Sequence, residues 1–180
     1  MARDVMRVLL VQPRRRQGAG FRAGFRTLAV VEPMGLELIV ATLTPQHDVQ
    51  LVDLLPGVDL ESEIRRFVPD VCGVSCSFTV DVMATVEVAE TVKRIRPETF
   101  VLVGGHHASL NPRDFALPCI DAVLVGEGEA AMPEVVEALS TGAALASVRG
   151  LVLNTPAGQA ATGLRPLALE LDSLPLPARE

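Results

Sequence analysis

The chain has 180 residues, which suits a single domain with a short extension. Hydrophobic residues make up 49% of it and aromatic residues only 3%, so the expected core is aliphatic, like that of a buried parallel sheet. A net charge of −6 argues against a general nucleic-acid surface, and no apolar run approaches the roughly 20 residues of a membrane span. No signal peptide is recognised at the N-terminus, and we expect a cytoplasmic protein.

Strand-like and helical patterns alternate along the chain. Strands are expected at 6–12, 48–54, 70–76, 100–105 and 121–128, and helices at 33–45, 59–68, 81–97 and 129–142. This alternation predicts an α/β fold with a five-stranded parallel sheet and helices on both faces. A β-hairpin is expected at 150–162, turned at a Pro-Ala-Gly sequence. The expected division is an α/β domain at 1–145, a hairpin extension at 146–163 and a Pro-rich linker at 164–180.

Two local features suggest chemistry without specifying it. Residues 13–26 contain five arginines and no acid, which fits either a phosphate or RNA contact or a mobile, solvated loop.

The three cysteines provide no even disulfide framework, as expected in a reducing compartment. Cys72 and Cys76 have the first spacing of a C-x3-C-x2-C iron–sulfur loop, but Thr79 occupies the third position. We therefore expect no cluster within this chain.

The functional site is expected in the loops that follow the strands. In an open parallel sheet, ligands bind outside the carboxyl ends of the strands, near the point where strand order reverses. These loops read QPRRRQGAG, SCSFT, GGHHAS and GEGE after the first, third, fourth and fifth strands. Glycines let a bulky ligand approach the backbone and hydroxyls supply hydrogen bonds, although a tight turn or a helix cap also explains each loop. The GEGE carboxylates would repel phosphate, and fit either a helix N-terminus or an amide-bearing ligand.

The adjacent residues His106 and His107 are two of only three histidines in the chain. Neighbours in an extended loop point apart, so a metal site built from both is not favoured. We expect one imidazole to face a cofactor and the other to face solvent or a supporting residue, with His107 as the candidate metal ligand. His47 is expected in a solvated turn. No residue has the pattern of a nucleophile or a proton-transfer pair, and no catalytic residue is predicted.

The order of the motifs is similar to that of a known family. VLLVQP, PMGLELIVATL, DVQLVDL, PDVCGVSCSFT, VLVGGHHASLNP, DAVLVGEGEAAMPEVVEAL, GLVLN and DSLPLPAR resemble, in series, the N-terminal cobalamin-binding domain of B12-dependent radical SAM enzymes. That class includes methyltransferases and the anaerobic Mg-protoporphyrin monomethyl ester cyclase group. The resemblance implies a flavodoxin-like, Rossmann-like fold with strand order 2-1-3-4-5. It also implies cobalamin over the carboxyl ends of the strands, with its dimethylbenzimidazole tail threaded into the sheet.

Carried over by position, the resemblance implies a set of cofactor contacts. They are Gln12, Pro13, Gly35, Leu36, Ser75, Ser77, Phe78, Thr79, Gly104, Gly105, His106, His107, Gly126, Glu127, Gly128 and Glu129. Many relatives have Pro where His106 stands. The loop after the first strand contains no histidine, unlike the Asp-x-His-x-x-Gly loop of other cobalamin proteins. The cofactor is therefore expected base-off, without that ligand.

The resemblance also implies a partner, a radical SAM domain in cis or in trans that holds S-adenosylmethionine and a 4Fe–4S cluster. The chain stops after DSLPLPARE, before any cluster motif. It would then be the cofactor module of a methyltransferase or cyclase-type enzyme, in which cobalamin relays a methyl group. The alternatives are a stand-alone carrier or sensor of cobalamin, haem or another tetrapyrrole, or an FMN site. A receiver-like module is not favoured, because Ser75-Cys76-Ser77 stands where a phosphoacceptor Asp is needed.

Overall fold

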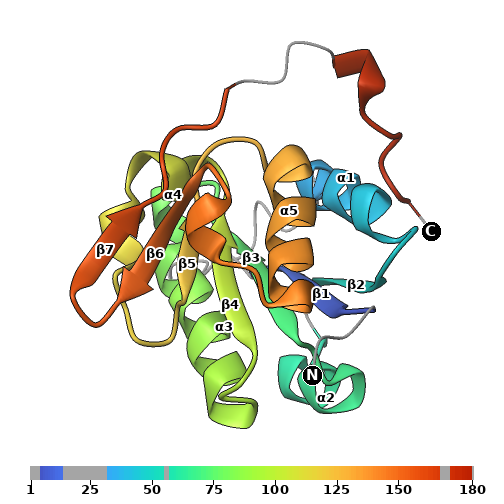
Figure 1. The fold of residues 1–180 in the computed structure, drawn as a ribbon. Coiled ribbons are helices and arrows are strands. Elements are labelled where there is room, and N and C mark those ends of the chain that lie inside the picture. Colours follow the sequence, from blue (N-terminus) through green and yellow to red (C-terminus); the bar gives the residue numbers. More distant parts are fainter. Residues whose placement is uncertain (1–4, 14–31, 55–56, 167–170, 180) are drawn as a thin grey trace.

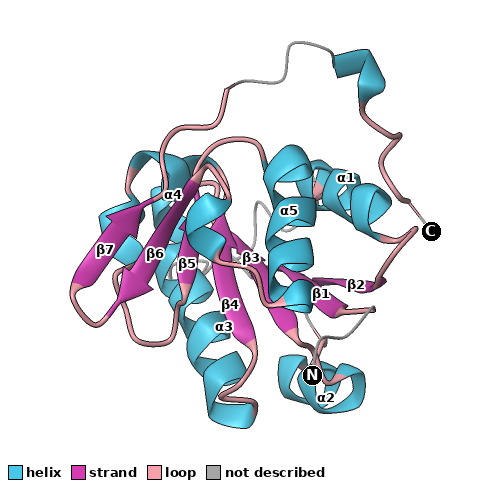
Figure 2. Cartoon of the chain, viewed as in Figure 1, coloured by secondary structure: helices cyan, strands magenta, loops and turns pink. Residues whose placement is uncertain are grey.

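A computed structural model of the chain describes residues 5–13, 32–54, 57–166 and 171–179. Its described strands form one sheet, with helices packed against both faces (Figures 1 and 2). The strands are β1 (Arg7–Gln12), β2 (Asp48–Asp53), β3 (Val71–Ser75), β4 (Phe100–Gly104), β5 (Ala122–Leu124), β6 (Leu151–Thr155) and β7 (Gly158–Ala161). The helices are α1 (Met34–Leu43), α2 (Leu60–Phe67), α3 (Val82–Ile95), α4 (His106–Leu110) and α5 (Gly128–Thr141). Short 3-10 turns are η1 (Thr79–Asp81), η2 (Pro112–Phe115), η3 (Leu145–Ser147) and η4 (Leu171–Ser173).

The sheet has the order β2-β1-β3-β4-β5-β6-β7. The pairs from β2 to β5 are parallel, so the predicted five-stranded core with order 2-1-3-4-5 is confirmed. The predicted hairpin, β6 and β7, continues the same sheet by antiparallel pairing of β6 with β5. The sheet therefore has seven strands among the described residues, two more than the predicted parallel core. The domain boundaries at 145 and 163 stay a prediction.

Alternation along the strands builds two apolar layers. Side chains such as Leu9, Cys72 and Val101 pack against α2 and α3 on one face. Their neighbours in sequence, such as Leu10 and Leu102, pack against α1 and α5 on the other face. Because both faces of the central strands are covered, β1 reads as a continuous apolar run, which is typical of parallel sheets.

Side-chain amides fix the hairpin to the rest of the sheet. Nδ2 of Asn154 on β6 donates to the carbonyl oxygens of Phe115 at 2.7 Å and Ile120 at 2.8 Å. Nε2 of Gln159 on β7 donates to the carbonyl of Pro112 at 2.9 Å. These carbonyls belong to the connection between α4 and β5, so the hairpin and that connection stabilise each other.

Two local expectations are wrong. His47 is buried rather than solvated, and its Nδ1 lies 3.4 Å from the backbone nitrogen of Met6, which donates to it. The stretch after β4 is not an extended loop, because helix α4 begins at His106 immediately after Gly105. Five helical residues are too few to show a period in the sequence.

The C-terminal segment returns to α1. The backbone nitrogen of Ala178 donates to the carbonyl of Glu37 at 3.2 Å, and the Arg179 guanidinium lies 3.5 Å from a carboxylate oxygen of Glu32. Figure 1 shows this segment at the α1 side of the molecule, away from the hairpin that precedes it. Apart from Pro13, the basic segment at 13–26 lies outside the described residues.

Candidate functional site

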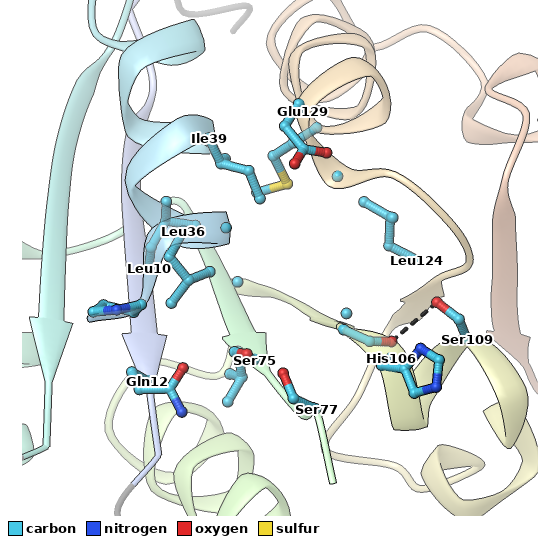
Figure 3. Close-up of a pocket in the computed structure, with 18 of the residues that line it drawn as sticks. Leu10, Gln12, Leu36, Ile39, Ser75, Ser77, His106, Ser109, Leu124 and Glu129 are labelled. Carbon is cyan, nitrogen blue, oxygen red and sulfur yellow. Dashed lines mark hydrogen bonds between the residues drawn. The ribbon is translucent and has the colours of Figure 1, made fainter. Parts of the chain in front are cut away.

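A cavity of about 630 Å³ opens at the carboxyl ends of β1, β3, β4 and β5 (Figure 3). It lies between α1 and α5, beside the point where β1 has β2 on one side and β3 on the other. This is the switch point at which open α/β sheets bind ligands. The volume falls within the range of roughly 300–1,000 Å³ that small-molecule sites occupy.

The floor of the cavity is apolar. It is made by Leu10, Leu102 and Leu124 on the sheet, Leu36 and Ile39 on α1, and Met132 on α5. Gly73 on β3 keeps this space open, because a Cβ there would stand 2.8 Å from Cδ2 of Leu10 and 3.5 Å from Cε of Met132. The floor therefore suits a flat, apolar group that enters between the sheet and the two helices.

The rim of the cavity is polar and largely without internal partners. The side chains of Gln12, Ser75, Ser77, His106 and Glu129 make no hydrogen bond or ion pair with the described residues. Polar groups held at a cavity mouth in this way are available to a ligand.

A serine joins two strand-end loops at the same rim. The Ser109 hydroxyl donates to the carbonyl of Gly105 and accepts from the backbone nitrogen of Gly126, both at 3.0 Å. The loops after β4 and β5 are thus held together, and the polar side chains that they carry keep fixed positions around the mouth.

The glycine pair allows the ends of β3 and β4 to approach closely. Gly105 has φ +109°, and a Cβ there would lie 2.7 Å from the carbonyl oxygen of Cys76. The backbone nitrogen of Cys76 donates to Gly104 at 2.7 Å, and that of His107 donates to Cys76 at 3.1 Å. The glycine pair therefore forms the tight turn and also lines the cavity, so both expectations for it hold.

The two histidines have different environments. His106 is exposed and lines the cavity (Figure 3). His107 is buried and does not: its Nε2 lies 2.9 Å from a carboxylate oxygen of Asp114, and its Nδ1 lies 3.2 Å from the Thr79 hydroxyl. In the neutral imidazole with its proton on Nε2, the ring donates to Asp114 and accepts from the Thr79 hydroxyl at Nδ1. The ring also packs edge-on against Phe115 at 6.1 Å.

This geometry corrects the sequence prediction for His107. Both ring nitrogens are engaged within the protein, so His107 is placed to fix α4 against η1 and η2 rather than to contact a cofactor or a metal. Among the described residues, no group of three or more His, Cys, Asp or Glu side chains is arranged to hold a metal ion. Burial raises the pKa of the nearby Cys76 thiol, which keeps it protonated and a poor ligand.

Most of the predicted contacts come together in space. All the residues carried over from the family line the cavity except Pro13, Thr79 and His107. Pro13 follows β1 and is buried, while Thr79 serves His107. Apart from Leu36, the sequence reasoning missed the apolar floor, and it also missed Glu32, Asp81 and Ser109 as cavity residues. The two-residue alternation of the strands could have identified Leu10, Leu102 and Leu124, because each lies on the same sheet face as Gly73 or Gly104.

Comparison with known proteins identifies the family. Residues 25–136 match the family described as the B12 binding domain. The chain belongs to that family. It is 32% identical over 97% of its length to an uncharacterized methyltransferase of Pyrococcus horikoshii, and 36% identical over 71% to the hopanoid C-3 methylase of Methylococcus capsulatus. It spans only 38% and 26% of the length of these two relatives.

Two solved structures with cobalamin bound contain a part of similar fold. One is the radical S-adenosylmethionine methyltransferase TsrM from Kitasatospora setae with cobalamin and a 4Fe–4S cluster bound, at a TM-score of 0.73 and 22% identity. The match covers 96% of this chain and 31% of that one. Another is the cobalamin-dependent radical enzyme OxsB with aqua-cobalamin bound, at a TM-score of 0.75 and 16% identity, covering 97% and 24%. In the part of the chain that the structure describes, no helix combines the length and apolarity needed to cross a bilayer.

Proposed function

We propose that this chain binds cobalamin in the cavity between α1 and α5. The observation that carries the proposal is the pairing of an apolar floor, opened by Gly73, with a rim of polar side chains that have no partners among the described residues. Cobalamin has matching parts, an aromatic nucleotide base and a ring whose periphery carries amides. The floor would take the base, and Gln12, Ser75, Ser77 and His106 would bind the amides.

We further propose that the cofactor is held base-off without a histidine from the loop after β1. That loop contains no histidine, and His107 has both ring nitrogens engaged. Among the described residues, His106 is the histidine that lines the cavity, and it lies at the end of β4. The space above Gly73 would accommodate the released base.

The chain is proposed to be the cofactor module of a larger B12-dependent radical SAM enzyme. Its relatives named as methyltransferases are more than twice as long, which leaves room for a domain that binds S-adenosylmethionine and a 4Fe–4S cluster. Bound cobalamin supplies the methyl-transfer chemistry in such an enzyme. The residues of this chain bind the cofactor, orient it and exclude water from its buried part, and we assign no catalytic residue among them.

Haem and FMN fit this cavity less well. Four carboxylate residues, Glu32, Asp81, Glu127 and Glu129, line it, and no described lysine or arginine does. The two propionates of haem and the terminal phosphate of FMN would bring more negative charge to these carboxylates than the single phosphodiester of cobalamin does. His106 is the feature that most favours haem, because an exposed imidazole can bind iron.

Cobalamin retention tests the proposal. The protein is incubated with hydroxocobalamin, desalted, and examined by visible spectroscopy, with haem in a parallel sample. We expect a corrin spectrum in the protein fraction and little retained haem. A protein fraction without corrin absorbance would overturn the proposal.

The base-off state has its own test. Electron paramagnetic resonance of the reduced cob(II)alamin complex is expected to lack nitrogen superhyperfine splitting. An unchanged spectrum in His106→Ala would confirm that this histidine does not replace the base. Nitrogen splitting that remains in His106→Ala would contradict base-off binding, whereas splitting that is lost in that variant would identify His106 as the axial ligand.

A further inference from the structure

One acidic residue of the cavity differs from the others in its surroundings. Glu129 lies in the first turn of α5, is partly buried, and points toward the cavity in Figure 3. Glu32 is paired with Arg179, and Asp81 and Glu127 also have interactions within the protein. Glu129 makes no hydrogen bond or ion pair with any described residue.

The other free polar groups at the rim can adapt to a ligand. The Gln12 amide, the hydroxyls of Ser75 and Ser77, and the His106 imidazole can each either donate or accept a hydrogen bond. These groups would bind an amide and a carboxylate about equally well. An ionised glutamate can only accept, so among the rim groups without a described partner Glu129 is the one that distinguishes an amide from a carboxylate.

We propose that Glu129 makes the cavity selective for fully amidated corrinoids over corrinoids that carry a peripheral carboxylate. This inference rests on the proposed function and specifies the ligand class of the same site. A primary amide donates an N–H to the glutamate in a charge-assisted hydrogen bond. A carboxylate at the same place supplies no donor and adds a like charge, in a partly buried position where solvent screens it incompletely.

The position of Glu129 at the N-terminus of α5 does not account for selectivity. A carboxylate in a first helical turn stabilises the helix whether or not a ligand is present, by roughly 0.3–1 kcal/mol. That contribution stabilises the folded protein, so it affects the affinity for amidated and carboxylated corrinoids equally. The ratio of the affinity for cobalamin to the affinity for a monocarboxylate therefore reports only the direct contact between Glu129 and the ligand.

The experiment measures that ratio. Equilibrium dissociation constants are determined for cobalamin and for each isomeric monocarboxylate made by hydrolysing one propionamide of the ring. Wild-type protein is expected to bind at least one isomer about tenfold more weakly than cobalamin, with a smaller ratio at high salt. Glu129→Gln is expected to bring that ratio to within about twofold, because the new amide donates to a carboxylate. The control, Glu137→Gln, removes the same charge from an exposed position of α5 and is expected to keep the wild-type ratio.

Two results would overturn the inference and can be told apart. Equal binding of cobalamin and all isomers by wild-type protein removes the selectivity, and a ratio that survives Glu129→Gln removes the role of Glu129 in it; both leave cobalamin binding intact. Failure of wild-type protein to bind any corrinoid removes the proposed function, and the inference with it. Circular dichroism and thermal unfolding of each variant verify that the fold is retained.

Discussion

At the scale of single residues, two neighbouring histidines serve different purposes because a helix begins between Gly105 and His106. Successive helical residues point about 100° apart, so His106 faces the cavity while His107 turns toward η1 and η2. The sequence predicted that one histidine would face the ligand and the other a supporting residue. It named His107 as the candidate metal ligand, whereas the helix directs that ring toward Thr79 and Asp114 and away from the cavity.

Substitution of each histidine should separate stability from binding. His107→Ala is expected to lower the free energy of unfolding by about 2–4 kcal/mol, because Asp114 and Thr79 lose a buried partner. His106→Ala should change stability by less than about 0.5 kcal/mol and weaken cobalamin binding roughly three- to tenfold. Urea unfolding and equilibrium titration measure the two effects. A destabilised His106→Ala with a normal His107→Ala would reverse our assignment.

At the scale of elements, the cavity exists because small residues stand where the sheet meets α1 and α5. Gly73 leaves the middle of β3 without a side chain on the cavity face. Gly128 allows α5 to approach α1, because a Cβ there would lie 2.7 Å from Cδ1 of Ile39. The expected helices and strands are confirmed at nearly every position. Helix α4 was missed because five residues show no period, and β5 is shorter than expected because the chain turns at Gly126 with φ +96°.

Filling the floor of the cavity should affect the ligand more than the fold. Gly73→Val is expected to weaken cobalamin binding at least about tenfold, because the new side chain occupies the space between Leu10 and Met132. Stability should fall by only about 1–3 kcal/mol, because valine is favourable in a strand. Cys72→Val, the control, changes the opposite face of β3 and should retain binding. Equal affinities of wild-type and Gly73→Val protein would show that the ligand does not enter the floor.

At the scale of the whole molecule, the apolar layer that packs against α2 and α3 holds the thiols of Cys72 and Cys76 away from water. Burial raises the pKa of Cys72 to about 12, from an ordinary value of 9.0, and also raises the pKa of Cys76 and Cys119. The chain has no tyrosine and a single lysine, Lys93, so few other groups titrate above pH 9. Below pH 9 the Cys72 thiol is neutral in both folded and unfolded chains, and its contribution to stability is fully present. Above that pH only the unfolded chain ionises, so stability is lost progressively until about pH 12.

The alkaline loss of stability can be measured directly. Between pH 8 and pH 10, the free energy of unfolding of wild-type protein should fall by roughly 1.4 kcal/mol more than that of Cys72→Val. Urea titrations under reducing conditions at several pH values give the two slopes. Parallel slopes for the two proteins would mean that Cys72 is not the buried titrating group.

The sequence by itself determined the alternation of elements, the parallel core and the edge of the sheet where a ligand would bind. Local propensity and the two-residue and 3.6-residue periods can be read directly from the sequence, and the handedness of crossovers is a general rule that applies to them. Only the tertiary structure decided which histidine faces the cavity, that β6 pairs with β5, and that Glu129 has no partner among the residues that the structure describes. Those outcomes depend on contacts between segments such as Thr79 with His107 and Asn154 with Phe115, which no local pattern encodes.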